Sequence, residues 1–295
     1  MLKISKITFA LLAACWFTTG YAASKNDIQK TAGSYGPNYA QVADLYHPPP
    51  GILIKGLVIW VHGGSWTSGD KTDGIGQLVA PLIANGIAVL AMNYRLRDEG
   101  AFPNSVEDVQ AVLSAVDSGG CATCTSSVTW QSAQNYAKYG LMLSGFSAGG
   151  YLAVMGGMRH LAINPNSALK CIGNVVGPVD LRAYPETSDK QKYAVTVLSG
   201  GNLSESSLNS MSPVVYMRSG AWNEAAPKVK WYLRFNTRDR LTQFDRTTQF
   251  VDALKQTGAR GSLETVNESG LGHGITPATA QKFIINSIAE CLVGK

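Results

Sequence analysis

Short, uninterrupted apolar runs recur along this chain and predict buried β-strands. Runs that are apolar at every position are expected where helices cover both faces of a sheet. They occupy residues 57–61, 86–92, 141–144, 172–176 and 231–235. Residues 262–266 have the composition of a further strand, and residues 39–46 alternate weakly, which is typical of a strand at the edge of a sheet.

Between the runs, apolar residues are spaced as on one face of a helix. Residues 105–116 show this spacing, with Ser105 as N-cap and Asp108 three residues later, which approximates a capping box. Further helices are expected near residues 77–85, from residue 151 onward, over 244–257 and over 277–292. Strands that alternate with helices predict an α/β fold with a mostly parallel central sheet and helices on both faces.

Two stretches show neither the apolar runs of buried strands nor the spacing of a helix face. Residues 23–36 are polar and contain glycine, so we expect a flexible leader there. Residues 181–228 are polar and poorly periodic, and we expect an irregular excursion over the upper edge of the sheet that carries binding residues. The remaining elements fit one domain over residues 37–295.

The N-terminus has the pattern of an export signal. Two lysines precede an apolar stretch over residues 7–17, which is too short to span a bilayer comfortably. Small residues suit cleavage after Ala22, which defines a signal peptide of residues 1–22. The residues before Cys15 also resemble a lipobox, in which Cys15 would be lipidated and would anchor the protein to a membrane. Because the apolar stretch before Cys15 is very short, we favour soluble export to the periplasm or the medium.

The composition narrows the classes of protein. Of the 295 residues, 45% are hydrophobic and 15% are charged, which argues against wholesale disorder. The formal net charge is +5, of which Lys3 and Lys6 contribute two before the predicted cleavage site. Since the lysines and arginines form no cluster, this small excess does not indicate a nucleic-acid partner.

Apart from Cys15, the chain has four cysteines, an even number that suits two disulfides in an oxidising compartment. Cys121 and Cys124 also resemble a redox pair or half of a metal site. No second such pair and no histidine pair in the sequence completes a zinc set, so we expect no metal. Of the three possible pairings, we expect Cys121 with Cys124, which are close in sequence, and Cys171 with Cys291.

A candidate nucleophile follows the apolar run at residues 141–144. Ser147 lies between Gly145 and Gly149, and a helix is expected to start at Tyr151. The two glycines leave room for a turn so sharp that the residue between them is strained, which would lift the Ser147 hydroxyl off the backbone. This is the nucleophile-elbow pattern, and the alternative is an ordinary glycine-rich turn.

A serine hydroxyl needs a base and a group that orients the base. In hydrolases with this elbow, the acid and then the histidine follow the serine along the chain. Two histidines lie downstream of Ser147: His160 ends a predicted helix, while His273 lies in a glycine-rich loop and is the expected base. Asp239 directly follows a predicted strand and is the expected acid. Asp245 is the alternative, but it stands at the start of the next helix, where an acidic residue already has a capping role.

The segment His62-Gly63-Gly64-Ser65-Trp66 follows the strand at residues 57–61. Consecutive glycines let backbone N–H groups converge on a negatively charged oxygen, and the N–H of Ala148 would act from the other side. We expect His62 to organise this loop through a hydrogen bond rather than to act as a second base.

These motifs stand in the order found in the α/β-hydrolase superfamily. They comprise HGGSW, NYRL, FP followed by EDV, GFSAGG, SP, TRDRL and GHG. The chain most resembles secreted esterases and lipases with an HGG-x-W loop, a group that includes hormone-sensitive-lipase-like carboxylesterases, feruloyl-esterase-like enzymes and kynurenine-formamidase-like proteins. The resemblance implies backbone donors at Gly64, Ser65 and Ala148, with Gly63 beside them. Ser65 stands in place of the third glycine of the commoner HGGG, and Asn236 where the family often has glycine.

The residues and the resemblance together predict an exported serine hydrolase that cleaves small carboxylic esters through an acyl-enzyme. Ser147, Asp239 and His273 would form the triad, and no cofactor would be needed. One alternative is an amide-directed hydrolase, formamidase-like or peptidase-like. Another is a hydrolase fold that only binds ligands, against which the presence of all three triad residue types argues. A membrane contact is expected only if Cys15 is lipidated.

Overall fold

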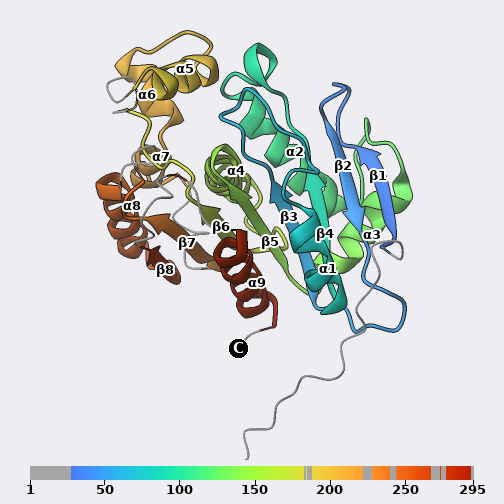
Figure 1. Cartoon of the computed structure of the whole chain (residues 1–295). Helices are drawn as coiled ribbons and strands as arrows, with labels where there is room; N and C mark the ends of the chain where they lie inside the picture. The colour runs from blue at the N-terminus through green and yellow to red at the C-terminus, as the bar shows by residue number, and fades with distance from the viewer. Residues whose placement is uncertain are drawn as a thin grey trace, which may run out of the picture.

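The computed structural model of the protein describes residues 28–182, 184, 188–221, 228–239, 244–266, 273 and 277–293. The predicted signal peptide and Cys15 lie outside these residues. Figure 1 shows one twisted sheet with helices on both faces. Within the described ranges, no helix is long and apolar enough to cross a membrane.

The sheet is mostly parallel. Its strands are β1 Lys30–Ser34, β2 Val42–Tyr46, β3 Gly56–Val61, β4 Ile87–Met92, β5 Leu141–Phe146, β6 Leu169–Val175, β7 Lys230–Asn236 and β8 Arg260–Val266. Among the described residues their order is β1-β2-β4-β3-β5-β6-β7-β8. Strands β3 to β8 are parallel, while β1 and β2 form an antiparallel edge. The mostly parallel sheet predicted from the apolar runs is therefore confirmed.

Helices cover both faces of this sheet. They are α1 Gly76–Ala84, η2 Arg97–Gly100, α2 Asn104–Ser118, α3 Ser127–Ala137, α4 Ala148–Ile163, α5 Asp189–Leu198, α6 Glu205–Met211, α7 Pro213–Arg218, α8 Phe244–Gln256 and α9 Pro277–Val293. Helices α1 and α9 pack on one face, and α2, α3, α4 and α8 pack on the other (Figure 1).

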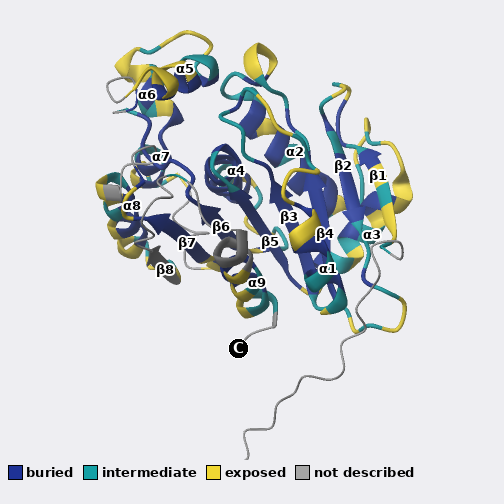
Figure 2. Ribbon diagram, viewed as in Figure 1, coloured by how far each residue is buried: buried dark blue, intermediate teal, exposed yellow. Residues whose placement is uncertain are grey.

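Alternate residues of the central strands enter two separate cores. In β3, Leu57 and Ile59 face α2, α3 and α4, while Val58 and Trp60 face α1 and α9. Every residue of β3 is buried, because each face of the strand is covered. Figure 2 shows the buried strands at the centre and the exposed residues on the outer helices and loops.

The predicted flexible leader is wrong over Lys30–Ser34, which form β1. The prediction of an edge strand over residues 39–46 is also wrong. Strand β2 lies inside the sheet, because it pairs with β1 on one side and β4 on the other. Contacts with distant residues hold β1 in place: Lys30 forms an ion pair with Asp44 at 2.9 Å, and Trp130 of α3 donates its indole N–H to the Ser34 carbonyl. Local periodicity cannot reveal a strand that such contacts stabilise.

The predicted capping box at Ser105 and Asp108 is also wrong. Helix α2 begins after Pro103, and both residues are buried inside the helix. The Asp108 carboxylate accepts hydrogen bonds from the backbone N–H of Arg95 at 2.8 Å, from its Nε at 2.9 Å, and from Gln41 Nε2 at 2.7 Å. Asp108 therefore fastens α2 to the segment that follows β4.

The predicted irregular excursion over residues 181–228 contains three short helices, α5, α6 and α7. Ser188 and Ser204 cap α5 and α6 by accepting hydrogen bonds from the backbone N–H groups of Gln191 and Ser207. Pro213 occupies the first turn of α7, where a backbone N–H has no partner within the helix and its absence costs nothing. These helices are too short for their periodicity to stand out, and α3 was not predicted either.

Candidate active site

The predicted site residues follow the carboxyl ends of four parallel strands, which lie on the same side of the sheet. Strand β3 leads into the segment that starts at His62, β5 into Ser147, β7 into Asp239, and β8 precedes His273. The carboxyl ends of parallel strands share one edge, so residues far apart in sequence converge there.

The turn after β5 has the strained form expected of a nucleophile elbow. Ser147 has φ 53° and ψ −119°, and its backbone N–H donates to the Val175 carbonyl at 2.9 Å. A side chain at Gly149 would overlap the carbonyl oxygen of Val61, so only glycine fits there. Helix α4 begins at Ala148, three residues before the predicted start, because the strand passes into the helix through Ser147 alone, without a loop.

The structure brings Ser147, His273 and Asp239 together. Ser147 Oγ lies 2.7 Å from His273 Nε2, and His273 Nδ1 lies 2.8 Å from Asp239 Oδ2. The Asp239 side chain is fully buried, whereas the His273 side chain is 23% exposed. Since the carboxylate accepts the proton on Nδ1, Nε2 presents its lone pair to the Ser147 hydroxyl. This arrangement can remove a proton from the serine.

The remaining acid and histidine candidates lie elsewhere. Asp245 is in the first turn of α8, as expected, and Thr248 donates to its backbone carbonyl. His160 Nε2 contacts Asp117 at 2.9 Å, and His47 contacts Thr31 and Tyr136.

The loop after β3 is organised around His62. Its Nδ1–H donates to the Gly63 carbonyl at 2.7 Å, and its ring stacks on Tyr94 with the centroids 4.4 Å apart. The Tyr94 hydroxyl donates to the His62 carbonyl at 3.1 Å. The Gly64 carbonyl accepts from the backbone N–H groups of Thr67 and Ser68. The carbonyls of both glycines are thus fixed within the loop.

Fixing these carbonyls also orients the N–H groups in the same peptide planes, because the C=O and N–H of a trans peptide point in opposite directions. The N–H of Gly64 therefore points away from the His62 ring, and that of Ser65 points away from the turn. Ser65 and Ala148, the first residue of α4, line one small groove with Ser147 and His273. The structure thus brings Ser65 and Ala148, from two different elements, to the groove that Ser147 lines.

Burial determines the charge of His62. It is 1% exposed, and burial lowers its pKa from 6.5, although its hydrogen bond to Gly63 acts in the opposite direction. Its Nε2 has no hydrogen-bond partner among the described residues. A second proton would therefore be placed on a buried, unpartnered nitrogen, which keeps His62 neutral at neutral pH.

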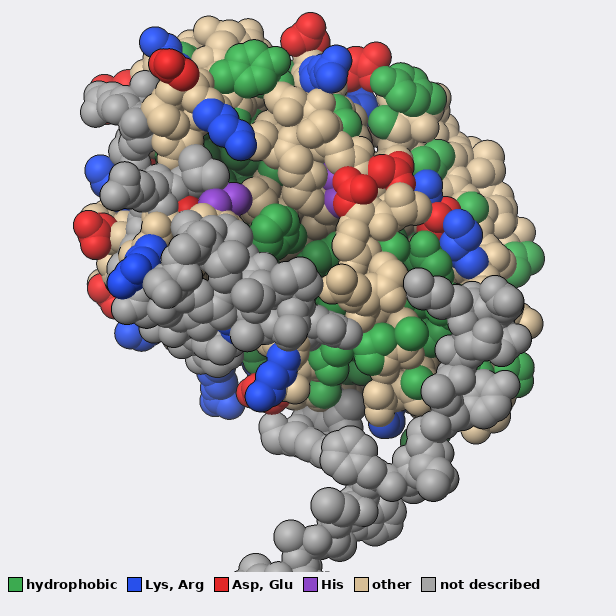
Figure 3. All heavy atoms as spheres, in the orientation of Figure 1, with side chains coloured by type: hydrophobic (Ala, Val, Ile, Leu, Met, Phe, Trp, Pro, Cys, Tyr) green, Lys and Arg blue, Asp and Glu red, His purple; other side chains and the backbone are tan. Residues whose placement is uncertain are grey.

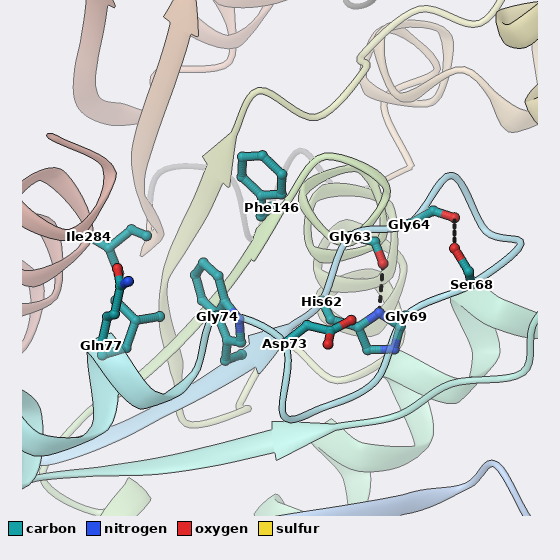
Figure 4. Close-up of a pocket in the computed structure, with 12 residues that line it drawn as sticks. His62, Gly63, Gly64, Ser68, Gly69, Asp73, Gly74, Gln77, Phe146 and Ile284 are labelled. Atoms are coloured by element: carbon teal, nitrogen blue, oxygen red, sulfur yellow. Dashed lines mark hydrogen bonds between the residues drawn. The ribbon is translucent and has the colours of Figure 1, made fainter. Parts of the chain in front are cut away.

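Ser147 lines one hollow, and its neighbour Phe146 lines a second. The groove named above has a volume of about 40 Å³, and Lys190, Gln191 and Ala194 of α5 form its other wall. A larger cavity of about 470 Å³ lies between the loop after β3, α1 and α9 (Figure 4). Sequence reasoning did not single out its apolar walls, because a residue that lines a cavity and one that fills the core give the same pattern. On the face seen in Figure 3, the described acidic and basic side chains are interspersed.

Comparison with known proteins gives a family match. The BD-FAE family model matches residues 43–223, more than half of the chain. This range includes the loop after β3 and Ser147, and it ends before Asp239 and His273.

Individual relatives are more distant. The chain is 27% identical over 248 residues to a probable isoprenylcysteine alpha-carbonyl methylesterase of Oryza sativa subsp. japonica, a match that covers 78% of this chain and 53% of the relative. It is 31% identical over 123 residues to a kynurenine formamidase of Salmo salar, covering 41% of this chain and 36% of the relative. The chain thus spans about half, or less, of the length of these relatives.

Among solved structures, carboxyl esterase 2 from the mycorrhizal fungus Tuber melanosporum superposes with a TM-score of 0.68 at 18% identity. The match covers 91% of this chain and 89% of that chain. A likeness at this level of identity concerns the fold, and it agrees with the fold expected from the sequence.

Proposed function

The chain belongs to the BD-FAE family of α/β-hydrolases, and from this premise we propose that it is a serine hydrolase that cleaves small carboxylic esters. The observation that carries the proposal is the pair of short contacts from Ser147 to His273 and from His273 to Asp239, at 2.7 and 2.8 Å. These contacts connect a nucleophile to a base and the base to an orienting acid, which is the arrangement used for acyl transfer through a serine.

In the first half-reaction, Ser147 Oγ attacks the acyl carbon while His273 Nε2 takes the hydroxyl proton. The negative charge that forms on the carbonyl oxygen is stabilised by the backbone N–H groups of Gly64, Ser65 and Ala148. Gly63 has no side chain to obstruct this site. The ester C–O bond then breaks, His273 gives its proton to the departing alkoxide, and the acyl group remains on Ser147.

In the second half-reaction, water attacks the acyl-enzyme and His273 accepts a proton from it. Cleavage of the bond to Ser147 Oγ releases the acid, and His273 returns the proton to the serine. Asp239 stays ionised throughout, holds the proton on Nδ1 and stabilises the imidazolium that forms in each half.

An amide-directed activity is the second candidate, because the chain is 31% identical to a kynurenine formamidase over 123 residues. His273, held by the same contacts, can also protonate a departing amine. Matched substrates separate the two candidates, since p-nitrophenyl acetate and p-nitroacetanilide share the acyl group and differ in the bond that is cleaved. A kcat/KM that favours the anilide would replace ester with amide as the substrate class.

The proposal is tested with Ser147→Ala and with Ser210→Ala, a control on α6. A fluorophosphonate probe should label the native protein and the control at one serine, and should leave Ser147→Ala unlabelled. Turnover of p-nitrophenyl acetate should fall about a million-fold in Ser147→Ala. Activity within about tenfold of the native protein would contradict the assignment of Ser147. A native protein that is neither labelled nor active would indicate a fold that only binds ligands.

We propose in addition that the protein is exported. Two disulfides, Cys121–Cys124 and Cys171–Cys291, support this, because such bonds persist in oxidising compartments. Mass spectrometry of the mature N-terminus tests it. Cleavage after Ala22 and lipidation at Cys15 give different masses, and an intact Met1 would contradict export.

A further inference from the structure

The 470 Å³ cavity beside Ser147 has no role in the mechanism described so far. In Figure 4, Gln77 and Ile284 lie on one side of it, Gly63 and His62 lie on the other, and Phe146 lies at the top of the view. These residues come from α1, α9, the loop after β3 and the end of β5. The cavity therefore opens where the nucleophile and the loop with the proposed backbone donors meet.

Two residues of the cavity wall, Gly63 and Phe146, are neighbours of the serine. Phe146 immediately precedes Ser147. A β-carbon added to Gly63 would lie 3.0 Å from the Phe146 ring and 3.3 Å from Ser147 Cβ. A side chain at position 63 would crowd both residues, so glycine keeps the space between Ser147 and the cavity free of one.

The cavity walls are mainly apolar. Trp60, Leu78 and Ile284 are each at most 5% exposed and belong to the core under α1 and α9, and Phe146 packs against that core. The volume falls within the range of small-molecule sites and is about three times that of an engineered apolar cavity that binds benzene. Asp73 is the acidic residue among the described walls and disfavours an anionic occupant.

The position of the base determines which part of the substrate lies on each side. The leaving oxygen must receive a proton from His273 Nε2, so the leaving group lies in the groove of about 40 Å³ that His273 lines. The carbonyl oxygen faces the backbone N–H groups. The third substituent on the reacting carbon, the acyl chain, is left with the remaining space beside Ser147, which Gly63 borders together with the Phe146 ring, 6.1 Å from the His273 ring.

We propose that this cavity is the acyl subsite, and that the protein prefers esters of bulky, uncharged, apolar acids to acetate esters. The proposal rests on the proposed ester hydrolysis. Each methylene that enters the cavity leaves water, which favours catalysis when the burial is complete in the transition state. An acetyl group has no methylene that can enter the cavity, so it gains no such stabilisation of the transition state.

The experiment measures kcat/KM for two ester series. One varies the acyl group of p-nitrophenyl esters from acetate to octanoate, and the other varies the alcohol of acetate esters from ethyl to octyl. Native protein should gain about fourfold per methylene in the acyl series until the cavity is filled. It should show no such gain in the alcohol series.

Two variants narrow the cavity from different helices, Ile284→Phe on α9 and Leu78→Phe on α1. Each should lower the ratio of kcat/KM for octanoate to kcat/KM for acetate by about tenfold or more. The control is Ile288→Val, a change in the same core one turn along α9, which should leave the acyl preference unchanged. Retained turnover of acetate shows that a variant has folded.

Two outcomes overturn the proposal. One is a flat acyl series in the native protein. The other is a pair of variants that discriminate among alcohols and not among acyl groups, which would make the cavity the leaving-group subsite. Failure of the proposed function is distinct from both, because the native protein would then hydrolyse no ester and would not react with the fluorophosphonate probe.

Discussion

At the scale of single residues, the identity of the acid is the sharpest question. Asp239 contacts His273 Nδ1 at 2.8 Å, while Asp245 lies in the first turn of α8. Asp239→Asn should lower kcat about ten-thousand-fold, because an amide favours the wrong imidazole tautomer. Asp245→Asn should leave kcat nearly unchanged and cost about 1 kcal/mol or less in stability. Turnover and melting temperature of both variants check this, and the reverse pattern would make Asp245 the acid.

Under the proposed mechanism, His62 acts on the reaction through the peptide that it orients. Its hydrogen bond fixes the Gly63 carbonyl and so the direction of the Gly64 N–H. His62→Leu removes that bond, and misplacing one donor to the oxyanion should lower kcat about a hundredfold with little change in KM. The matched control is His47→Leu, which removes a histidine that contacts Thr31 and Tyr136 instead and should leave kcat unchanged. A kcat within about threefold of the native value would show that the peptide plane is held without His62.

The same histidine also links stability to pH. Burial lowers the pKa of both His62 and His47 below 6.5, so below about pH 6.5 the unfolded chain binds more protons than the folded chain. The stabilisation is complete above about pH 6.5 and is lost as the pH falls, with a limiting slope of about 1.4 kcal/mol per pH unit for each histidine.

Denaturant titrations of the free energy of unfolding between about pH 7.5 and pH 5 measure this slope. His62→Leu should have a shallower slope than the native protein. The carboxylates whose pKa is lowered, such as Asp117 and Asp180, lose their contribution below about pH 4 and do not interfere. An identical slope in the variant would mean that His62 does not titrate in this range.

At the scale of elements, the two disulfides predicted from the sequence are confirmed, and they differ in what they constrain. Cys171–Cys291 joins β6 to α9 across 120 residues, whereas Cys121–Cys124 closes a separation of 3. On the chain-entropy model, the long loop contributes about 5 kcal/mol and the short one about 2 kcal/mol. Replacing Cys171 and Cys291 by serine should therefore lower the melting temperature by more than replacing Cys121 and Cys124. Equal shifts would show that loop length does not determine the contribution.

At the scale of the whole molecule, the apolar runs predict the central parallel strands, since burial on both faces leaves a signal in the residues themselves. The candidate triad follows from the same signal, because Ser147 and Asp239 come directly after such runs. Strand β1 depends on partners elsewhere in the chain, and the helices α5 and α6 are too short for their periodicity to stand out. Asp108 was predicted to cap a helix, but a distant guanidinium and amide bind it inside the molecule. The cavity that we propose as the acyl subsite leaves no signal in the sequence, because an apolar cavity wall has the same composition as a filled core.

The arrangement of the triad along the chain has a consequence for the order of events during synthesis. Ser147 and His273 are separated by 126 residues. A ribosome therefore finishes the nucleophile well before it reaches the base, and β7 and β8 must join the growing sheet before the two side chains can meet. Until then the serine lacks its proposed base, so under the proposed mechanism a partly made chain has no hydrolytic activity toward the esters of the cell that makes it.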